Sequence, residues 1–106
     1  MTTETKKVLL SGVKPTGRPH IGNYFGAMRQ FVKWQDDHQT MIMIADYHAL
    51  TSATDPAVLQ ADIYNLALDY LAIGLEPDKV ILFRQSEVAE HTELAWIFNC
   101  LTTMPY

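Results

Sequence analysis

A histidine, a glycine and an asparagine stand together in His20-Ile21-Gly22-Asn23, at the start of a predicted helix. Residues three apart share one face of the first helical turn, so His20 and Asn23 flank a position without a side chain. A base or ribose could lie against Gly22 while the two side chains donate hydrogen bonds to phosphates. The alternative is an ordinary helix N-terminus, with His20 near the cap and the glycine present for close packing.

A glycine-rich turn leads into this helix. The apolar run at residues 8–10 is followed by Gly12, Gly17 and Gly22, after which apolar side chains recur at helical spacing. This order predicts a strand, a tight loop and a helix. Unpaired N–H groups at a helix start, together with the positive end of the helix dipole, favour an anion such as phosphate. The stretch therefore predicts a nucleotide site.

Two common phosphate-binding motifs do not fit this turn. Gly12 and Gly17 have the spacing of a Walker A loop, but Arg18 and Pro19 follow where lysine and a hydroxyl residue are required. The dinucleotide fingerprint needs two glycines two residues apart, which this stretch lacks. The turn is therefore neither a P-loop nor a dinucleotide fingerprint.

The segment SGVKPTGRPHIGNYFGAM resembles the signature segment of class I aminoacyl-tRNA synthetases, with HIGN matching their H-I-G-H sequence. It is most similar to the tryptophanyl-tRNA synthetase family, whose signature commonly ends in asparagine. Two later segments, IADYHALT and FRQSEVAEHTELAW, resemble that family's segments in order and spacing. The lysine-rich K-M-S-K-S loop of the class is absent. The resemblance, from about residue 8 onward, is therefore to an amino-terminal fragment of the enzyme.

The resemblance implies roles for individual residues. His20 and Asn23 would be the catalytic contacts, donating to ATP phosphates as charge develops at the α-phosphorus. The implied ATP-binding residues are Lys14, Pro15, Thr16, Gly22, Asn23 and Gly26. The implied amino-acid pocket is formed by Leu10, Gly12 and His48. Mg²⁺ would be bound with ATP, and the resemblance implies no dedicated metal ligand in this chain.

Several of these positions have a second interpretation. Lys14 replaces the family's usual glutamine, and it could contact phosphate or be a solvated surface lysine. Leu10 could be a buried strand residue, and His48 a neutral core histidine hydrogen-bonded to backbone. Asp46 could orient His48 or cap a loop. The pair Gln85 and Ser86 could contact the amino acid or ribose, or form a strand-end turn.

Structural roles are predicted for the remaining residues of these motifs. Gly26 is expected to permit helix packing, and Arg18 to face solvent. On the last predicted helix, packing roles are expected for Trp96, Phe98 and Cys100.

Strand and helix patterns alternate along the chain. Apolar runs predict three strands, at residues 8–10, 41–45 and 79–83, and the second run is typical of a strand covered on both faces. Helical spacing predicts three helices, at residues 20–37, from the Asp55 cap and Pro56 to Gly74, and from Thr92 onward. In the first helix, one face is predicted to carry Ile21, Phe25, Met28 and Val32.

This βαβαβα pattern predicts an α/β fold, half of a Rossmann-like doubly wound parallel sheet with strand order 3-2-1. Ligands of such sheets bind at the carboxyl ends of the strands, so residues 11–12, 46–48 and 85–86 should meet at one crevice. The first strand would leave an apolar edge open. We therefore expect the chain to be marginally stable or to self-associate.

The composition of the chain favours some classes of protein and excludes others. The chain has 106 residues, 48% of them hydrophobic and 19% charged, which is typical of one globular domain. Residues 1–7 are expected to form a mobile tail without a secretory signal, and residues 8–106 an incomplete catalytic domain in the cytoplasm. No apolar run predicts a membrane span. The only cysteine, Cys100, excludes an internal disulfide, and a net charge of −4 argues against a broad RNA-binding surface.

The function implied by the resemblance is that of a tryptophan–tRNA ligase, which activates tryptophan with ATP and transfers it to tRNA. The tRNA would bind mainly through segments absent here, the full-length enzyme would be a homodimer, and the fragment alone would have little or no activity. Three alternatives stay open. They are a tyrosyl-tRNA synthetase, another H-x-G-H nucleotidyltransferase, and an inactive folding unit or binding fragment.

Overall fold

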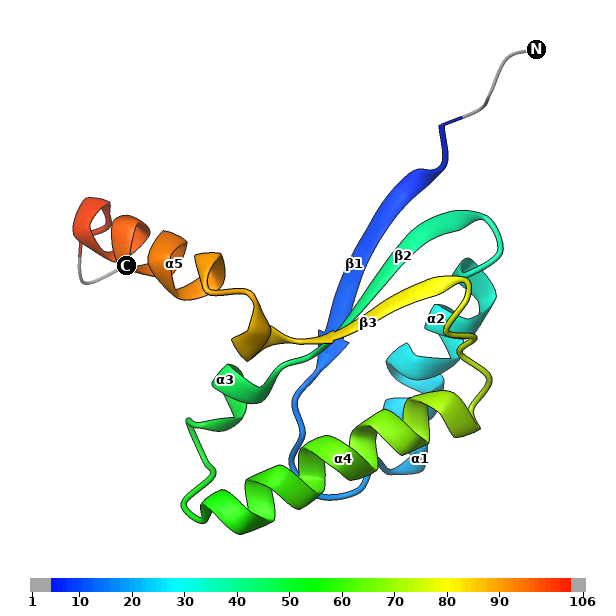
Figure 1. The fold of residues 1–106 in the computed structure, drawn as a ribbon, viewed down its shortest axis with the longest axis horizontal. Coiled ribbons are helices and arrows are strands. Elements are labelled where there is room, and N and C mark those ends of the chain that lie inside the picture. Colours follow the sequence, from blue (N-terminus) through cyan, green and yellow to red (C-terminus); the bar gives the residue numbers. More distant parts are fainter. Residues whose placement is uncertain (1–4, 104–106) are drawn as a thin grey trace.

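A computed structural model of the chain describes residues 5–103 and contains one parallel sheet (Figure 1). Its strands are β1 (Lys7–Val13), β2 (His38–Ile44) and β3 (Val80–Arg84), in the order β1-β2-β3. This is the predicted order 3-2-1 read from the other edge, and it confirms the half of a doubly wound sheet. Lys7, which the sequence placed in a tail, already pairs with β2, and residues 1–4 of that tail lie outside the described residues.

The helices that pack on the sheet lie on one of its sides (Figure 1). They are α1 (Ile21–Asn23), the π-helix η1 (Tyr24–Met28), α2 (Arg29–Trp34) and α4 (Pro56–Ala72). Between them and the sheet lies the core, which includes Met28, Phe31, Ile42, Leu66 and Tyr70. No helix within residues 5–103 is both long enough and apolar enough to cross a membrane.

The α4 helix begins and ends where the sequence predicts. The Asp55 side chain accepts a hydrogen bond from the backbone N–H of Ala57 at 2.8 Å, and Pro56 occupies the first turn. At the other end Gly74 has a φ of 112°, a conformation that L-residues rarely adopt. Leu75 N–H then bonds back to the Tyr70 carbonyl at 3.2 Å. Local capping chemistry therefore sets both ends of this helix.

The first helix differs from the single amphipathic helix predicted for residues 20–37. It contains the π-helical segment η1 and ends at Trp34, and β2 begins at His38, three residues before the predicted strand. Met28 and Phe31 are buried, whereas Ile21 and Phe25 are 74% and 52% exposed. A π turn takes up an extra residue and so rotates the preceding turn relative to the following one. The prediction that Ile21 and Phe25 share one face with Met28 is therefore wrong, because only Met28 of the three is buried.

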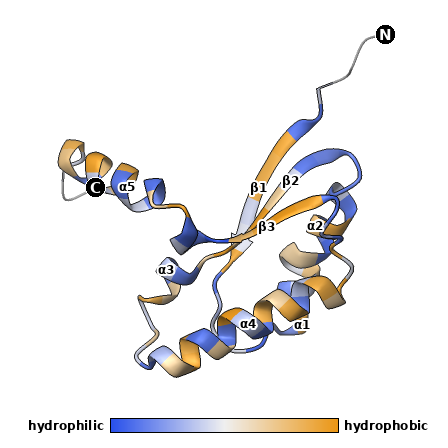
Figure 2. Ribbon diagram, in the orientation of Figure 1, coloured by the Kyte–Doolittle hydropathy of each residue, from blue (hydrophilic) through white to orange (hydrophobic). Residues whose placement is uncertain are grey.

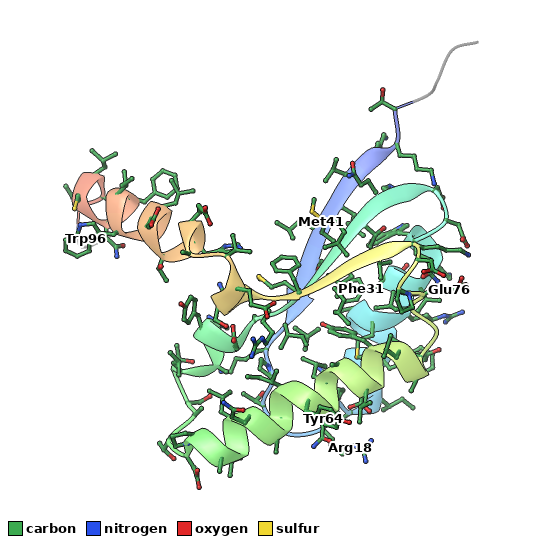
Figure 3. All side chains as sticks on the ribbon, viewed as in Figure 1. Arg18, Phe31, Met41, Tyr64, Glu76 and Trp96 are labelled. Atoms are coloured by element: carbon green, nitrogen blue, oxygen red, sulfur yellow. The ribbon has the colours of Figure 1, made fainter. Side chains whose placement is uncertain are left out.

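Within residues 5–103 no helix layer covers the opposite face of the sheet, although the His91 ring stacks on Phe83 at its carboxyl end, so the prediction that β2 is covered on both faces is wrong for the described residues. Side chains alternate along each strand, and the paired positions Leu10, Met41 and Ile81 share this face. Leu10 and Ile81 are 54% and 52% exposed. Figure 2 shows apolar segments in β1 and β3, and Figure 3 shows Met41 projecting away from the helix that carries Phe31. An apolar sheet face is thus open to solvent.

The described residues include three further helices. The helix α3 (Asp46–Ala49) follows β2, and the 3₁₀-helix η2 (Gln85–Glu87) follows β3. The longer helix α5 (Glu90–Leu101) begins two residues before the predicted start and extends away from the sheet (Figure 1). Trp96, Phe98 and Cys100 are exposed on it. Their predicted packing roles are wrong for the described residues, because no layer there lies against α5.

We predict that the 106-residue chain self-associates through its open sheet face. Removing a large aliphatic side chain from water contributes about 1.5–3 kcal/mol. Replacing Ile81 with lysine should therefore raise the concentration for half-association by at least about tenfold, as measured by sedimentation velocity. A wild-type chain that stays monomeric and unfolds cooperatively, with a midpoint independent of concentration, would contradict the prediction.

We also predict alkaline destabilisation through Tyr70. Burial raises the pKa of the Tyr70 phenol above its ordinary value. The folded chain therefore keeps a proton that the unfolded chain releases above about pH 10, and stability should fall as pH rises beyond that value. Urea unfolding at pH 8 to 11 should show this loss in the wild type and a smaller loss in Tyr70→Phe. Equal pH slopes would exclude Tyr70 as the source.

Candidate nucleotide and amino-acid site

The carboxyl ends of the three strands meet, as the sequence predicts. Ala45 N–H, just after β2, donates to the Val13 carbonyl at the end of β1 at 2.9 Å. His48 N–H donates to Gln85 Oε1 at 3.2 Å, which joins the segment after β2 to the segment after β3. Three segments far apart in sequence therefore form one sheet edge, which we call the strand-end cluster (residues 12–14, 45–51 and 85–86).

The helix start at His20 forms a capping box. His20 Nδ1 accepts from the backbone N–H groups of Gly22 at 3.0 Å and Asn23 at 3.4 Å, while Asn23 Oδ1 accepts from His20 N–H at 3.0 Å. In a neutral imidazole whose Nδ1 accepts, the proton is on Nε2. The ring Nε2–H and the Asn23 amide N–H groups are therefore oriented as donors. Capping and phosphate contact are compatible, because they use opposite ends of the same side chains.

The His20 ring, held by the helix cap, lies directly against Gly22. A Cβ built on Gly22 would lie 2.8 Å from His20 Cε1 and 2.9 Å from Nδ1, closer than carbon atoms approach. The ring thus occupies the space that the sequence suggested for a base or ribose. A Cβ on Gly26 would meet no atom of the described residues within 4 Å, so the predicted packing role of Gly26 is wrong there. Of these two glycines, Gly22 is the one whose Cβ would meet another side chain.

Gly12 permits close approach of β1 and β2. A Cβ at Gly12 would lie 2.5 Å from the Met43 carbonyl oxygen and 2.9 Å from Met43 Cβ. These two residues are paired in the sheet register. A side chain at Gly12 would therefore push the strands apart beside the strand-end cluster.

Replacing Gly12 with alanine is expected to lower the free energy of unfolding by about 1–3 kcal/mol, the usual cost of overpacking. The matched control is Gly26→Ala, in open space on a helix, which should raise stability by about 0.5–1 kcal/mol because glycine is entropically unfavourable there. Urea unfolding of both variants measures the difference. Equal stabilities would show that β1 and β2 can accommodate the methyl group.

The loop after β1 is held by polar contacts to distant segments. Lys14 Nζ donates to Thr51 Oγ1 at 3.3 Å, so this side chain spans the strand-end cluster rather than being only solvated. Gly17 has a φ of 67°, and its N–H donates to Asp62 Oδ2 at 3.0 Å. Arg18 is exposed, as predicted, and pairs with Asp69 at 3.1 Å. These contacts set the path of the loop between β1 and His20.

Two cavities border predicted site residues, one at the catalytic His20 and the other at the ATP-binding Pro15 and Thr16. A groove of about 530 Å³ lies between the helix start and α4, and its lining includes Arg18, His20, Tyr24 and Asp69. A smaller one of about 270 Å³ lies between the loop and the start of α4, and its lining includes Pro15, Thr16 and Asp55. Within residues 5–103 no hydrogen bond joins His20 or Asn23 to the strand-end cluster. The helix start and that cluster are thus linked through the loop from Lys14 to Arg18.

The side chains of Leu10 and His48 are exposed, so the alternative of a buried strand residue and a core histidine is wrong for this pair. Asp46 is buried and does not bond to the His48 side chain. Its carboxylate accepts from Tyr47 N–H at 3.0 Å, from Ser86 N–H at 2.9 Å and from the Ser86 hydroxyl. Asp46 therefore links α3, which follows β2, to η2, which follows β3.

The 3₁₀-helix η2 is further held by an ion pair. The Arg84 guanidinium lies 2.8 Å from Glu87, and their hydrogen bond lowers the pKa of the Glu87 carboxyl and raises that of Arg84. The links that Asp46 and Gln85 make between α3 and η2 were not predicted from the sequence. The sequence feature that could have indicated them is that polar residues, Asp46 and the pair Gln85 and Ser86, follow two neighbouring strands.

Comparisons with known proteins identify the family. The family model described as tRNA synthetases class I (W and Y) matches residues 2–105. A tryptophan–tRNA ligase from Fusobacterium nucleatum is 55% identical over 93 residues, which are 88% of this chain and 29% of the relative. The chain thus spans less than a third of that relative's length.

Two solved structures have the same fold. The tryptophanyl-tRNA synthetase from Campylobacter jejuni complexed with ADP and tryptophan matches with a TM-score of 0.83 and 42% identity, over 90% of this chain and 30% of that one. The Mycoplasma pneumoniae tryptophanyl-tRNA synthetase matches with a TM-score of 0.88 and 31% identity, over 93% and 29%. With the family match, these likenesses show that the chain belongs to the class I tRNA synthetases of the tryptophan and tyrosine group.

Proposed function

We propose that this chain supplies the ATP- and tryptophan-binding part of a tryptophan–tRNA ligase. The observation that carries the proposal is the capping box at His20 and Asn23, which orients two side-chain donors at a helix start. Support for tryptophan over tyrosine comes from the relatives, which are tryptophan–tRNA ligases, and from the Campylobacter jejuni enzyme complexed with ADP and tryptophan.

In this proposal the tryptophan carboxylate attacks the α-phosphorus of ATP, pyrophosphate leaves, and the aminoacyl group passes to tRNA. Catalysis is positioning and charge stabilisation without an enzyme nucleophile. His20 Nε2–H and the Asn23 amide donate to phosphate oxygens as negative charge develops. The ATP-binding residues are Lys14, Pro15, Thr16, Gly22, Asn23 and Gly26, and the amino-acid pocket contains Leu10, Gly12 and His48.

In this proposal Mg²⁺ binds together with the triphosphate of ATP. Within residues 5–103 no group of three or more His, Cys, Asp or Glu side chains could hold a metal ion. The ion would be held by phosphate oxygens, where it neutralises their charge, and no step here depends on a protein ligand to it.

The assembled enzyme is proposed to be a cytoplasmic homodimer that binds tRNA mainly outside this segment. The exposed apolar side chains of α5, among them Trp96, Phe98 and Leu101, support a further protein contact there. The net charge of −4 supports the placement of most tRNA contacts elsewhere.

An NMR titration of the isotope-labelled chain tests the proposal. Addition of ATP should shift amide signals of residues 14–26, and addition of tryptophan should shift those of residues near Leu10, Gly12 and His48. Tyrosine at the same concentration is the specificity control and should produce smaller shifts. Unchanged spectra at saturating ATP and tryptophan would identify the chain as a folding unit without a working site.

A further inference from the structure

The short helix α3 depends on side chains outside itself. It has four residues, Asp46–Ala49, too few to be stable alone in water. The first N–H groups of any helix lack partners within it. In α3, two of these N–H groups donate to side chains. Tyr47 N–H donates to the Asp46 carboxylate, and His48 N–H donates to Gln85 Oε1.

The same two side chains connect α3 to η2. The Asp46 carboxylate also accepts from both the backbone N–H and the hydroxyl of Ser86. Hydrogen bonds to an ionised carboxylate are about twice as strong as neutral ones, and Asp46 is buried. We call Asp46, Gln85 and Ser86 the strand-end clamp.

The clamp explains which way His48 faces. The His48 side chain is exposed, and its backbone N–H is the group held by Gln85. The Gln85 carbonyl oxygen and the Ser86 hydroxyl are both directed to protein groups. The contacts observed for this pair are therefore to α3, in keeping with the strand-end turn that the sequence offered as one interpretation.

We propose that Gln85, with Asp46 and Ser86, is a positioning residue that orients His48 toward bound tryptophan. The proposal rests on the function proposed above and deepens it. Tryptophan affinity should depend on the hydrogen bond from His48 N–H to Gln85. ATP affinity should not, because the proposed phosphate contacts lie at residues 14–26.

The test uses Gln85→Met in the 106-residue chain, which keeps the side-chain length and removes the acceptor. Amide hydrogen exchange at His48 should accelerate by up to about tenfold, the equivalent of one net hydrogen bond. The dissociation constant for tryptophan, from NMR titration, should rise by about tenfold, whereas that for ATP should not change. Gln85→Glu, which keeps an acceptor oxygen at the same distance, should restore both properties, and Gln60→Met on α4 is the matched control.

Each other outcome has a defined meaning. Wild-type exchange at His48 and wild-type tryptophan affinity in Gln85→Met would overturn the proposal, and so would an equal loss of ATP and tryptophan binding. If the unmodified chain binds no tryptophan, the proposed function fails for this chain, and the exchange rate at His48 still tests the clamp. If Gln85→Met does not fold, Ser86→Ala, which removes one hydroxyl donor to Asp46, provides the same two measurements.

Discussion

Truncating Tyr70 to alanine is expected to lower the free energy of unfolding by about 3–5 kcal/mol. Tyr70, on α4, is completely buried against α2 and β2, and its ring centroid lies 6.3 Å from that of Phe31. Small domains have a total stability of about 5–15 kcal/mol. One face of the sheet here has no helix layer, so we expect the free energy of unfolding of this chain to lie at the low end of that range. Urea unfolding followed by circular dichroism should show a variant unfolded in large part without denaturant.

The matched control for this truncation is Tyr64→Ala on the same helix. Tyr64 is 66% exposed, and surface substitutions usually change stability by less than about 0.5 kcal/mol. Both variants replace tyrosine with alanine on one helix and so gain the same helix propensity. The difference between their free energies of unfolding therefore measures what the buried Tyr70 side chain contributes. Similar unfolding midpoints for the two variants would show that the core does not depend on Tyr70.

The largest effect on function is expected from His20. Loss of one donor to charge that develops in a transition state typically costs about 10²–10³ in kcat. His20→Ser keeps an acceptor for the helix cap, because serine is a favoured cap residue, but removes the ring donor. Tryptophan-dependent pyrophosphate exchange can be measured in a chimera of this segment and the remaining sequence of the Fusobacterium nucleatum relative. His20→Ser should lower its rate by two to three orders of magnitude.

Asn23→Asp is the companion variant. It keeps Oδ1 as an acceptor for His20 N–H and replaces the amide donor with a carboxylate that repels phosphate. Stability of the 106-residue chain should stay near wild type in both variants, while ATP binding weakens. If both retain ATP affinity and exchange activity, His20 and Asn23 serve only as a helix cap.

Local chemistry made much of the fold predictable. Asp55 with Pro56 and Gly74 mark the ends of α4 through contacts within a few residues, which any fold must satisfy. Apolar runs alternating with helical periodicity allow few topologies, because crossovers in parallel sheets are right-handed. That constraint predicts the strand order and the meeting of the strand ends. The helix start at His20 was likewise predictable, since its cap bonds join residues two and three apart.

Other features depended on contacts between distant segments. The π segment changes which side chains of the first helix are buried, so Phe31 lies in the core and Phe25 does not. Gln85 contacts α3 because Asp46 and Ser86 bring two strand ends together, and no local pattern indicates this direction. Periodicity shows that a surface is apolar without showing what covers it. Leu10, Ile81 and Trp96 are therefore exposed here, although their sequence patterns are those of covered elements.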